Sequence, residues 1–306
     1  MSWYLTNYDP FTRWSNNQLN SLNSSEKIYI LGSSQVASLN LEYIENYLNV
    51  DKKNYLVYNL AQGSDLPSLR LGDIDKIITL NPSMVVYGVG LRDFESRQHY
   101  GLSPLGTTQI TSDNIFPTPQ IINEKTELTL KENDFINEIF KSPQVVTLRL
   151  FNFLIRGDLG YNYPDIELQT PLIQSGITPV ILNAEIKEKS VRESFSFGGL
   201  DQIENNLEFM AFNKILYKLQ NAGIPIIVYV VPHNQAHLDV ISIDDVELFK
   251  TTMEQVTTQN NVPLYYIYDK YVDLEIWGDI YHVAYNNNTL IYSNDVAEII
   301  KNEINS

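Results

Sequence analysis

The chain has 306 residues, of which 43% are hydrophobic and 19% charged, enough to bury the core of one large domain or of a domain with an insertion. Its formal net charge is −16, without any run of Lys and Arg, which argues against a surface for nucleic acid or anionic membranes. Cysteine is absent, so disulfides, thiolate metal sites and a cysteine nucleophile are excluded and the redox compartment stays open.

The N-terminal region is predicted to lie outside the folded domain. Residues 1–25 end in an Asn- and Ser-rich stretch, which indicates an arm or linker. They lack the charged start and apolar core of a signal peptide, and no run in the chain reaches the length of a membrane span. Whether an anchor precedes the chain is left open. Residues 26–306 are then expected to form a single domain.

The first predicted strand, residues 28–31, ends in a Gly-Ser-Ser turn. Gly32 permits a tight turn, and Ser34 falls at the start of a predicted helix, where free backbone amides favour a developing negative charge. A serine in this position can attack an acyl group while its own amide helps to hold the oxyanion. The alternative is that Ser33 and Ser34 only cap the helix.

Strands and helices alternate along the rest of the chain, which predicts a parallel α/β sheet with right-handed crossovers. Further strands are predicted at 55–60, 84–88, 224–231 and 263–268, and helices at 39–49, 67–80, 201–219, 244–259 and 293–304. The strand at 224–231 is the most apolar and is expected to be central. Residues 97–199 interrupt the alternation, with a helical pattern at 133–155, and are interpreted as an insertion covering one end of the sheet.

Polar residues follow the predicted strands, and ligands of open parallel sheets gather at the carboxyl ends of the strands. The residues expected at this edge are Ser34, Asn59, Gly63, Gly90, Arg92 and His233. Asp279 and His282 follow the fifth strand, three positions apart, so that the carboxylate can orient the imidazole. This pair is expected to point at Ser34.

The blocks Gly32-Ser33-Ser34, Asn59 with Gly63, the Gly90 region and Asp279-x-x-His282 occur in the order found in the SGNH/GDSL hydrolase superfamily, which this chain resembles. It looks most like the envelope branches, among them the alginate-acetylation proteins and the D-alanyl-transfer protein of teichoic acid synthesis. The resemblance implies a flavodoxin-like three-layer α/β/α sandwich around a parallel sheet of about five strands, without a cofactor.

The same resemblance implies a serine esterase or O-acyltransferase that acts on a small, acetyl-like ester of an envelope glycan. Ser34 would be the nucleophile, His282 the base and Asp279 its orienting partner, and the amides of Ser34 and Gly63 would hold the oxyanion. Asn59 and His233 are expected to line the substrate site. An extracytoplasmic location follows from the resemblance alone, and the oligomeric state is open.

One block departs from the family pattern. The third block of the family ends in Gly-x-Asn-Asp, whose Asn is an oxyanion donor, whereas this chain has Arg92 in the corresponding stretch. The guanidinium of Arg92 either supplies donors to the oxyanion or binds a substrate carboxylate. The alternative is a structural ion pair with Asp93 or Asp65. The missing Asn also leaves open a second function, that of an inactive carbohydrate-binding module with the same fold.

His233 and His237 are spaced like the histidines of zinc proteases, but the general base and a third ligand are missing, so no metal is expected. We expect His233 at a pocket rim, and His237 and His99 in solvent. A flavodoxin- or receiver-like protein is the remaining rival. It would need a phosphate-binding glycine loop or an acidic cluster after the first strand, and the sequence has neither.

Overall fold

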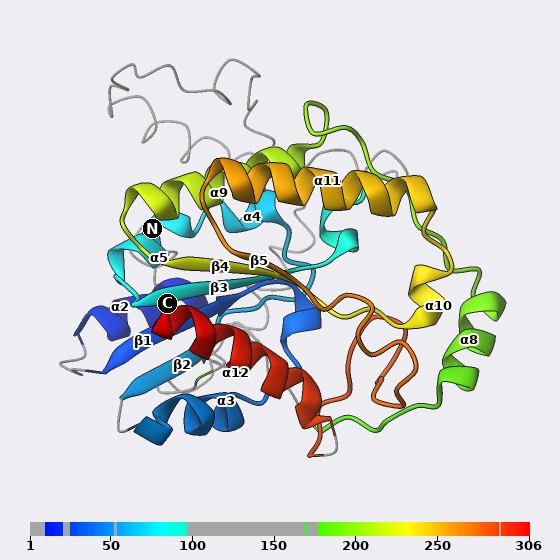
Figure 1. Ribbon diagram of the computed structural model, residues 1–306, viewed down its shortest axis with the longest axis horizontal. Coiled ribbons are helices and arrows are strands. Elements are labelled where there is room, and N and C mark those ends of the chain that lie inside the picture. Colours follow the sequence, from blue (N-terminus) through cyan, green and yellow to red (C-terminus); the bar gives the residue numbers. More distant parts are fainter. Residues whose placement is uncertain (1–9, 21–24, 52–53, 97–168, 170–176, 288) are drawn as a thin grey trace, which may run out of the picture. The chain divides into compact units, whose positions relative to one another are not determined.

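The computed structural model describes residues 10–20, 25–51, 54–96, 169, 177–287 and 289–306, which lie in one compact unit. Within these residues a five-stranded parallel sheet has the order β2-β1-β3-β4-β5 (Figure 1). The strands are β1 (Glu26–Leu31), β2 (Tyr55–Asn59), β3 (Met84–Val89), β4 (Ile226–Val230) and β5 (Leu264–Tyr266). The predicted α/β fold with a parallel sheet of about five strands is confirmed.

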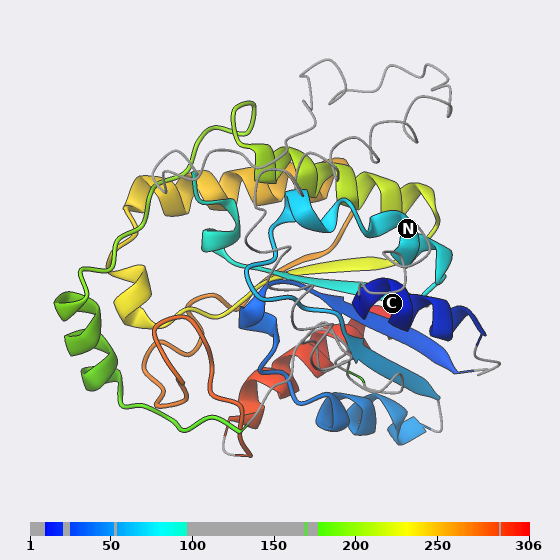
Figure 2. The same ribbon diagram turned by 180° about the vertical axis from the view of Figure 1, so that it is seen from behind.

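Helices cover both faces of the sheet (Figures 1 and 2). One face is covered by α2 (Pro10–Asn20), α4 (Pro67–Arg70), α5 (Ile74–Thr79), α9 (Leu207–Asn221) and α11 (Ile243–Gln259). The other face is covered by α3 (Leu41–Leu48) and α12 (Leu290–Asn305), which also pack against each other. The remaining short helices are η1 (Ser34–Val36), η2 (Asn49–Asp51), η3 (Leu91–Phe94), α8 (Asn183–Arg192) and α10 (Gln235–Leu238).

Because helices lie on both faces, the central strands are buried on both sides and read as continuous apolar runs. In β1, Tyr29 and Leu31 face one hydrophobic cluster while Ile28 and Ile30 face the other, and all four side chains are fully buried. The central strand is β3, and not the more apolar β4, which lies between β3 and β5. Because β4 has a strand on each side and a layer of helices on each face, it is as buried as a central strand. Its apolar composition therefore does not show which strand is the middle one of the sheet.

The N-terminal region is not only an arm. Residues 10–20 form α2, and the side chains of Phe11 and Trp14 are buried in the core. The Trp14 ring meets Tyr29 and Tyr58 edge-on, with ring centroids 5.5 and 5.4 Å away. The prediction of an arm or linker over residues 1–25 is therefore wrong for this segment, because two large aromatic side chains fill the layer beside the first two strands.

Two predicted helices differ from the observed ones. The helix expected at 67–80 is split into α4 and α5, with Gly72 between them. The helix expected at 201–219 begins at Leu207 because Asn206, and not Asp201, caps it, its side chain accepting from the amides of Glu208 and Phe209. Gly223, at φ +72°, follows its end as expected.

The expected insertion lies largely outside the described residues, including the helical pattern at 133–155. Its described end contains α8, whose Ile186 is 3% exposed and belongs to the same hydrophobic cluster as α3 and α12. Across the described ranges, no helix combines the length and the apolarity needed to cross a membrane.

The strand order places a switch point beside β1. The chain leaves β1 for β2 on one side and then returns to β3 on the other. At such a point the connections after the two neighbouring strands diverge and leave a crevice at the carboxyl edge, where ligands of open α/β sheets bind. The turn after β1 carries Ser34, so the topology itself places this serine at the expected binding edge.

Candidate active site

The turn that presents Ser34 depends on Gly32. Its φ is +148°, and a Cβ atom there would lie 2.5 Å from both the Gly88 carbonyl oxygen and Val36 Cγ2. Ser34 opens η1, a single 3₁₀ turn, and not the longer helix expected from the sequence, because α3 begins only at Leu41. A helix dipole therefore contributes little here, and the backbone amide of Ser34 itself is the relevant donor.

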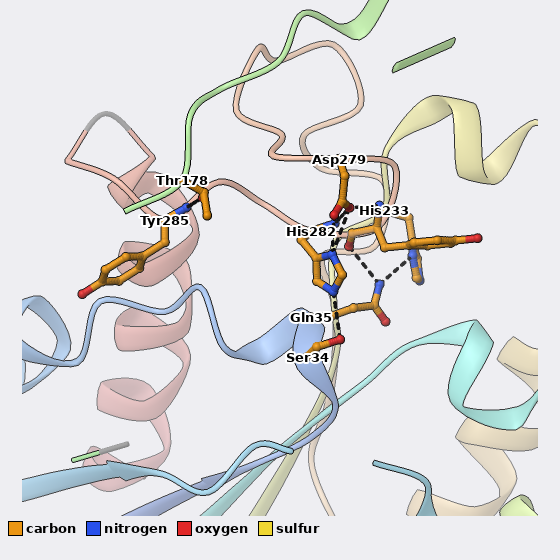
Figure 3. A network of polar contacts seen from close by, with 8 residues as sticks. Ser34, Gln35, Thr178, His233, Asp279, His282 and Tyr285 are labelled. Carbon is orange, nitrogen blue, oxygen red and sulfur yellow. Dashed lines mark hydrogen bonds and ion pairs between the residues drawn. The ribbon is translucent and has the colours of Figure 1, made fainter. Parts of the chain in front are cut away.

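Three side chains meet at this turn (Figure 3). The Oγ atom of Ser34 lies 2.8 Å from Nε2 of His282. On the other side of the imidazole, Nδ1 lies 2.8 and 2.9 Å from the two carboxylate oxygens of Asp279. Ser33, the residue in the N-cap position of η1, makes no side-chain capping bond. The hydroxyl of Ser34 thus has a histidine partner, which the capping alternative does not explain.

Asp279 and His282 are held in a tight turn, not in a helix. The Asp279 Oδ1 atom accepts hydrogen bonds from the amides of Tyr281 and His282, at 2.7 and 2.8 Å. The Gly278 amide closes the turn onto the His282 carbonyl at 2.8 Å. Burial acts to raise the pKa of Asp279, but hydrogen bonds from the His282 ring and these two amides outweigh it and hold the pKa below its usual range.

The carboxylate of Asp279 is therefore ionised at neutral pH, and it orients the imidazole with the Nδ1 hydrogen toward the carboxylate and Nε2 toward the Ser34 hydroxyl. The side chains of His282 and Asp279 remain 34% and 45% exposed. The base is thus open to an incoming water molecule or hydroxyl group.

Two backbone amides near Ser34 are available as donors. Within the described part of the chain, neither the Ser34 nor the Gly63 amide has a hydrogen-bond acceptor. The loop that carries Gly63 is tied to the serine turn, because the Gln62 amide donates to the Gly32 carbonyl at 3.1 Å. Apart from its two chain neighbours, no other described residue has an atom within 4 Å of the position that a Cβ atom on Gly63 would occupy. Among the described residues, the space beside Gly63 is therefore open.

Arg92 lies over Tyr281, the residue before the histidine. Its Cζ atom is 4.3 Å from the ring centroid, a cation–π contact. The alternative of an ion pair with Asp65 is wrong, because Asp65 pairs with the fully buried Arg70 at 2.5 Å. Asp93 instead accepts from the Gly90 amide at 2.7 Å, and among the described residues Arg92 forms no ion pair with either acid. Arg92 as a whole is an exposed residue next to the turn that carries the base.

Asp93 was not predicted as part of the site. Its carboxylate bonds the Ser33 hydroxyl as well as the Gly90 amide, and burial raises its pKa to about 7 although both hydrogen bonds act to lower it. The Gly90-x-x-Asp93 spacing is that of a capping box, with the acid bonding back to the first amide. This local signal could have identified Asp93 as a structural partner of the serine turn.

Asn59 and His233 are not placed to line a substrate site. Asn59 is 2% exposed, its Nδ2 donates to the Val36 carbonyl and its Oδ1 accepts from the Ala61 amide. It braces the serine turn instead. His233 and His237 are 0% and 3% exposed, so the expected pocket rim and solvent positions are wrong. His99 lies outside the described residues.

The two buried histidines bond each other, with their Nδ1 atoms 3.0 Å apart. In the described part of the chain, no group of three His, Cys, Asp or Glu side chains is arranged to hold a metal ion. Gln35 and Tyr281 also contact this pair, and neither was predicted, because no sequence pattern marks a glutamine that bonds residues about two hundred positions away.

A cavity of about 490 Å³ adjoins the turn that carries Asp279. Its apolar wall combines residues of the 177–195 segment with the tip of the turn, namely Ile181, Ile186, Phe195, Ile280 and Tyr281. Helix α8 adds charged side chains of both signs, Glu185, Glu188, Lys189 and Arg192. The cavity is therefore large enough for part of a substrate, and its lining is partly apolar and partly charged.

No protein-family model matches this chain, and no curated protein sequence matches it. Among solved structures, it is similar to the psychrotrophic esterase EstA from Pseudoalteromonas sp., at 10% identity over 92% of this chain and 100% of that chain, with a TM-score of 0.46.

Two further structures are similar over comparable lengths. TesA matches at 8% identity over 91% of this chain and 96% of its own, with a TM-score of 0.39. A lipase/acylhydrolase from Enterococcus faecalis matches at 10% identity over the same shares, with a TM-score of 0.43. Similarity at this level assigns neither a family nor an activity, so the function is inferred from side-chain geometry.

Proposed function

We propose that this protein is a serine-dependent ester hydrolase or acyltransferase. The observation that carries the proposal is the hydrogen-bonded series from Ser34 Oγ through the His282 ring to the Asp279 carboxylate, with distances of 2.8 Å on both sides of the ring. A nucleophile within hydrogen-bond reach of a base, and a base oriented by an ionised acid, is the arrangement that activates a serine.

The reaction proceeds in two halves. Nε2 of His282 takes the Ser34 proton while Oγ attacks the ester carbonyl carbon, and the Ser34 and Gly63 amides hold the oxyanion. The imidazolium then returns the proton to the leaving alcohol, and an acyl-serine remains. Water or another hydroxyl gives its proton to His282 and attacks the acyl carbon. The bond to Ser34 Oγ then breaks, and the imidazolium returns the proton to Oγ as the acyl product leaves. The Asp279 carboxylate stabilises the imidazolium in both halves.

Arg92 is proposed as a further donor to the oxyanion, in place of the Asn of the family pattern. Arg92 as a whole is an exposed residue, and its guanidinium is held against the Tyr281 ring at 4.3 Å, next to the turn that carries the base. A cation in this position strengthens stabilisation of a developing negative charge. Alternatively, the same guanidinium binds a carboxylate on the substrate, and the two roles are separated by kinetics below.

For the substrate we propose a small, acetyl-like ester of an envelope glycan, with water or a sugar hydroxyl as acceptor and an extracytoplasmic site of action. This finer assignment rests on the family resemblance of the sequence blocks. The exposure of His282 and Asp279, 34% and 45%, supports access by a bulky acceptor, and the cavity of about 490 Å³ beside Asp279 offers it room.

The test is the hydrolysis of p-nitrophenyl acetate by the wild type and by Ser34→Ala. The matched control is Ser38→Ala, which removes a buried hydroxyl that has no hydrogen-bond partner among the described residues. We expect Ser34→Ala to reduce kcat at least ~10³-fold and Ser38→Ala to retain it. Equal rates for the wild type and Ser34→Ala would contradict the proposal and would favour the inactive carbohydrate-binding module.

A further inference from the structure

The residue after the nucleophile reaches the turn that carries the base. The side chain of Gln35 is 6% exposed, and its Nε2 atom lies 3.2 Å from the Tyr281 carbonyl oxygen and 3.3 Å from Nδ1 of His233 (Figure 3). Gln35 follows Ser34 within η1, and Tyr281 precedes His282. One side chain thus joins the neighbour of the nucleophile to the neighbour of the base.

The hydrogen-bond chemistry fixes the direction of the contact between the two turns. The Tyr281 carbonyl can only accept, so the Gln35 amide nitrogen donates to it, and the same nitrogen faces His233 Nδ1. The Nδ1 atom of His237 lies 3.0 Å from His233 Nδ1. On the far side of the His233 ring, the Leu91 amide donates to Nε2 at 3.5 Å.

Both histidines are neutral at physiological pH, as this arrangement requires. Burial lowers the pKa of His233 well below its usual value, and the neighbouring His237 adds to the effect. Burial also lowers the pKa of His237 to about 4, with the nearby charge of Arg92 acting in the same direction. A protonated His233 would present a hydrogen to Gln35 and could not accept its bond.

The ring of Tyr281 is held from two further sides. The His237 ring meets it edge-on with centroids 4.9 Å apart, and Arg92 lies over its face at 4.3 Å. Gly90 leaves the room that Gln35 needs, since a Cβ atom there would lie 2.3 Å from Gln35 Oε1. The backbone and the ring of Tyr281 are therefore both fixed by side chains that take no part in the proton transfer.

We infer that Gln35, supported by the His233–His237 pair, is a positioning residue that locks the 279–282 turn onto the serine turn and so sets the distance between Ser34 and His282. This inference rests on the proposed function. Proton transfer requires the 2.8 Å separation of Oγ and Nε2, and a displacement of about 1 Å in such a pair can cost ~10²-fold in rate.

The test is Gln35→Met, which keeps the length of the side chain and removes both hydrogen bonds. We expect kcat for p-nitrophenyl acetate to fall ~10- to 100-fold in a variant that thermal unfolding shows to be folded. KM should stay within about two-fold, because Gln35 and His233 are 6% and 0% exposed and so do not face the solvent from which the ester binds. The matched control is Gln235→Met, the same change at an exposed side chain that bonds Asp239 and no other described residue, and it should retain wild-type kcat.

A second measurement needs no variant. Nitrogen-15 NMR of the wild type, which has only 4 histidines, should show a neutral His233 ring at pH 7. A folded Gln35→Met variant with unchanged kcat would overturn the inference, and so would a doubly protonated, charged His233 in the wild type. Because Ser34→Ala is measured in the same assay, full activity in that variant marks the failure of the proposed function and not of this inference alone.

Discussion

Nε2 of His282 lies 2.8 Å from Oγ of Ser34, although 248 positions separate the two residues. Strand adjacency does not bring them together, because β3 and β4 lie between β1 and β5. The segment between β5 and α12 instead passes along the carboxyl edge of the sheet (Figure 1), and its middle part places His282 against the turn after β1 before α12 begins. The geometry of the site thus depends on the conformation of the segment between β5 and α12, which carries both Asp279 and His282.

Asp279→Asn tests the orientation of the base. The amide would keep an oxygen for the backbone bonds from Tyr281 and His282, so the turn should persist. Its nitrogen would face His282 Nδ1 and favour the tautomer with Nε2 protonated, which cannot accept the Ser34 proton. We expect kcat to fall ~10³- to 10⁴-fold with little change in Tm. A steady-state measurement with less than a ten-fold loss would show that Asp279 does not select the tautomer.

Arg92→Ala separates the two roles proposed for the guanidinium. If Arg92 assists the oxyanion, kcat for neutral p-nitrophenyl acetate should fall ~10²-fold, and Arg92→Lys, which keeps a cation over Tyr281, should lose less. We expect this outcome. Unchanged kcat on the neutral ester, together with a raised KM only for esters that carry a carboxylate, would assign Arg92 to substrate binding instead.

Asp93→Asn should change how stability depends on pH. The pKa of Asp93 is raised from 3.8 to about 7. Between these values the unfolded chain has released this proton while the folded chain retains it, so the free energy of unfolding of the wild type falls as the pH rises through this window. Asparagine can still accept from the Gly90 amide and the Ser33 hydroxyl but lacks the buried charge.

The free energy of unfolding of the variant should therefore equal that of the wild type near pH 4. It should exceed that of the wild type at pH 8 by on the order of 3–4 kcal/mol. Urea unfolding at both pH values measures this difference. Asp65, whose pKa burial raises to about 6, contributes a slope of the same sign to both proteins. A difference that does not vary with pH would contradict the account of Asp93.

Trp14→Ala tests whether α2 belongs to the folded domain. Trp14 is 2% exposed and packs on Tyr29 and Tyr58, so its removal should lower the free energy of unfolding by about 3–5 kcal/mol. Leu19→Ala in the same helix is the control, because Leu19 is 53% exposed and its loss should cost about 0.5 kcal/mol or less. Equal changes in the free energy of unfolding for the two variants would instead support the interpretation of residues 1–25 as an arm.

Much of this architecture is readable from the sequence because its signals are local. Apolar runs that end in glycine or in polar turns predict the strands. The blocks Gly32-Ser33-Ser34 and Asp279-x-x-His282 predict the site residues that the structure brings together. The rule that ligands gather at the carboxyl edge of a parallel sheet then placed these blocks on one side. None of these steps needs a long-range contact.

What was missed depends on long-range packing. The burial of Trp14, His233 and His237 follows from which elements lie over them, and a short sequence window does not contain this information. Gln35 bonds partners 198 and 246 positions away, and η1 is too short to show a periodic pattern. Asn59 was expected to contact a ligand because it lies at the correct edge, yet its amide is used within the serine turn.

The central claim, that His282 activates Ser34, is tested most directly by peptide mass spectrometry after reaction with a serine-directed phosphonate. We predict a single adduct on Ser34 in the wild type, formed at least ~10³-fold more slowly in His282→Ala and at the wild-type rate in Ser38→Ala. The absence of an adduct, its formation on a different residue, or equal labelling rates in the wild type and His282→Ala would contradict the claim.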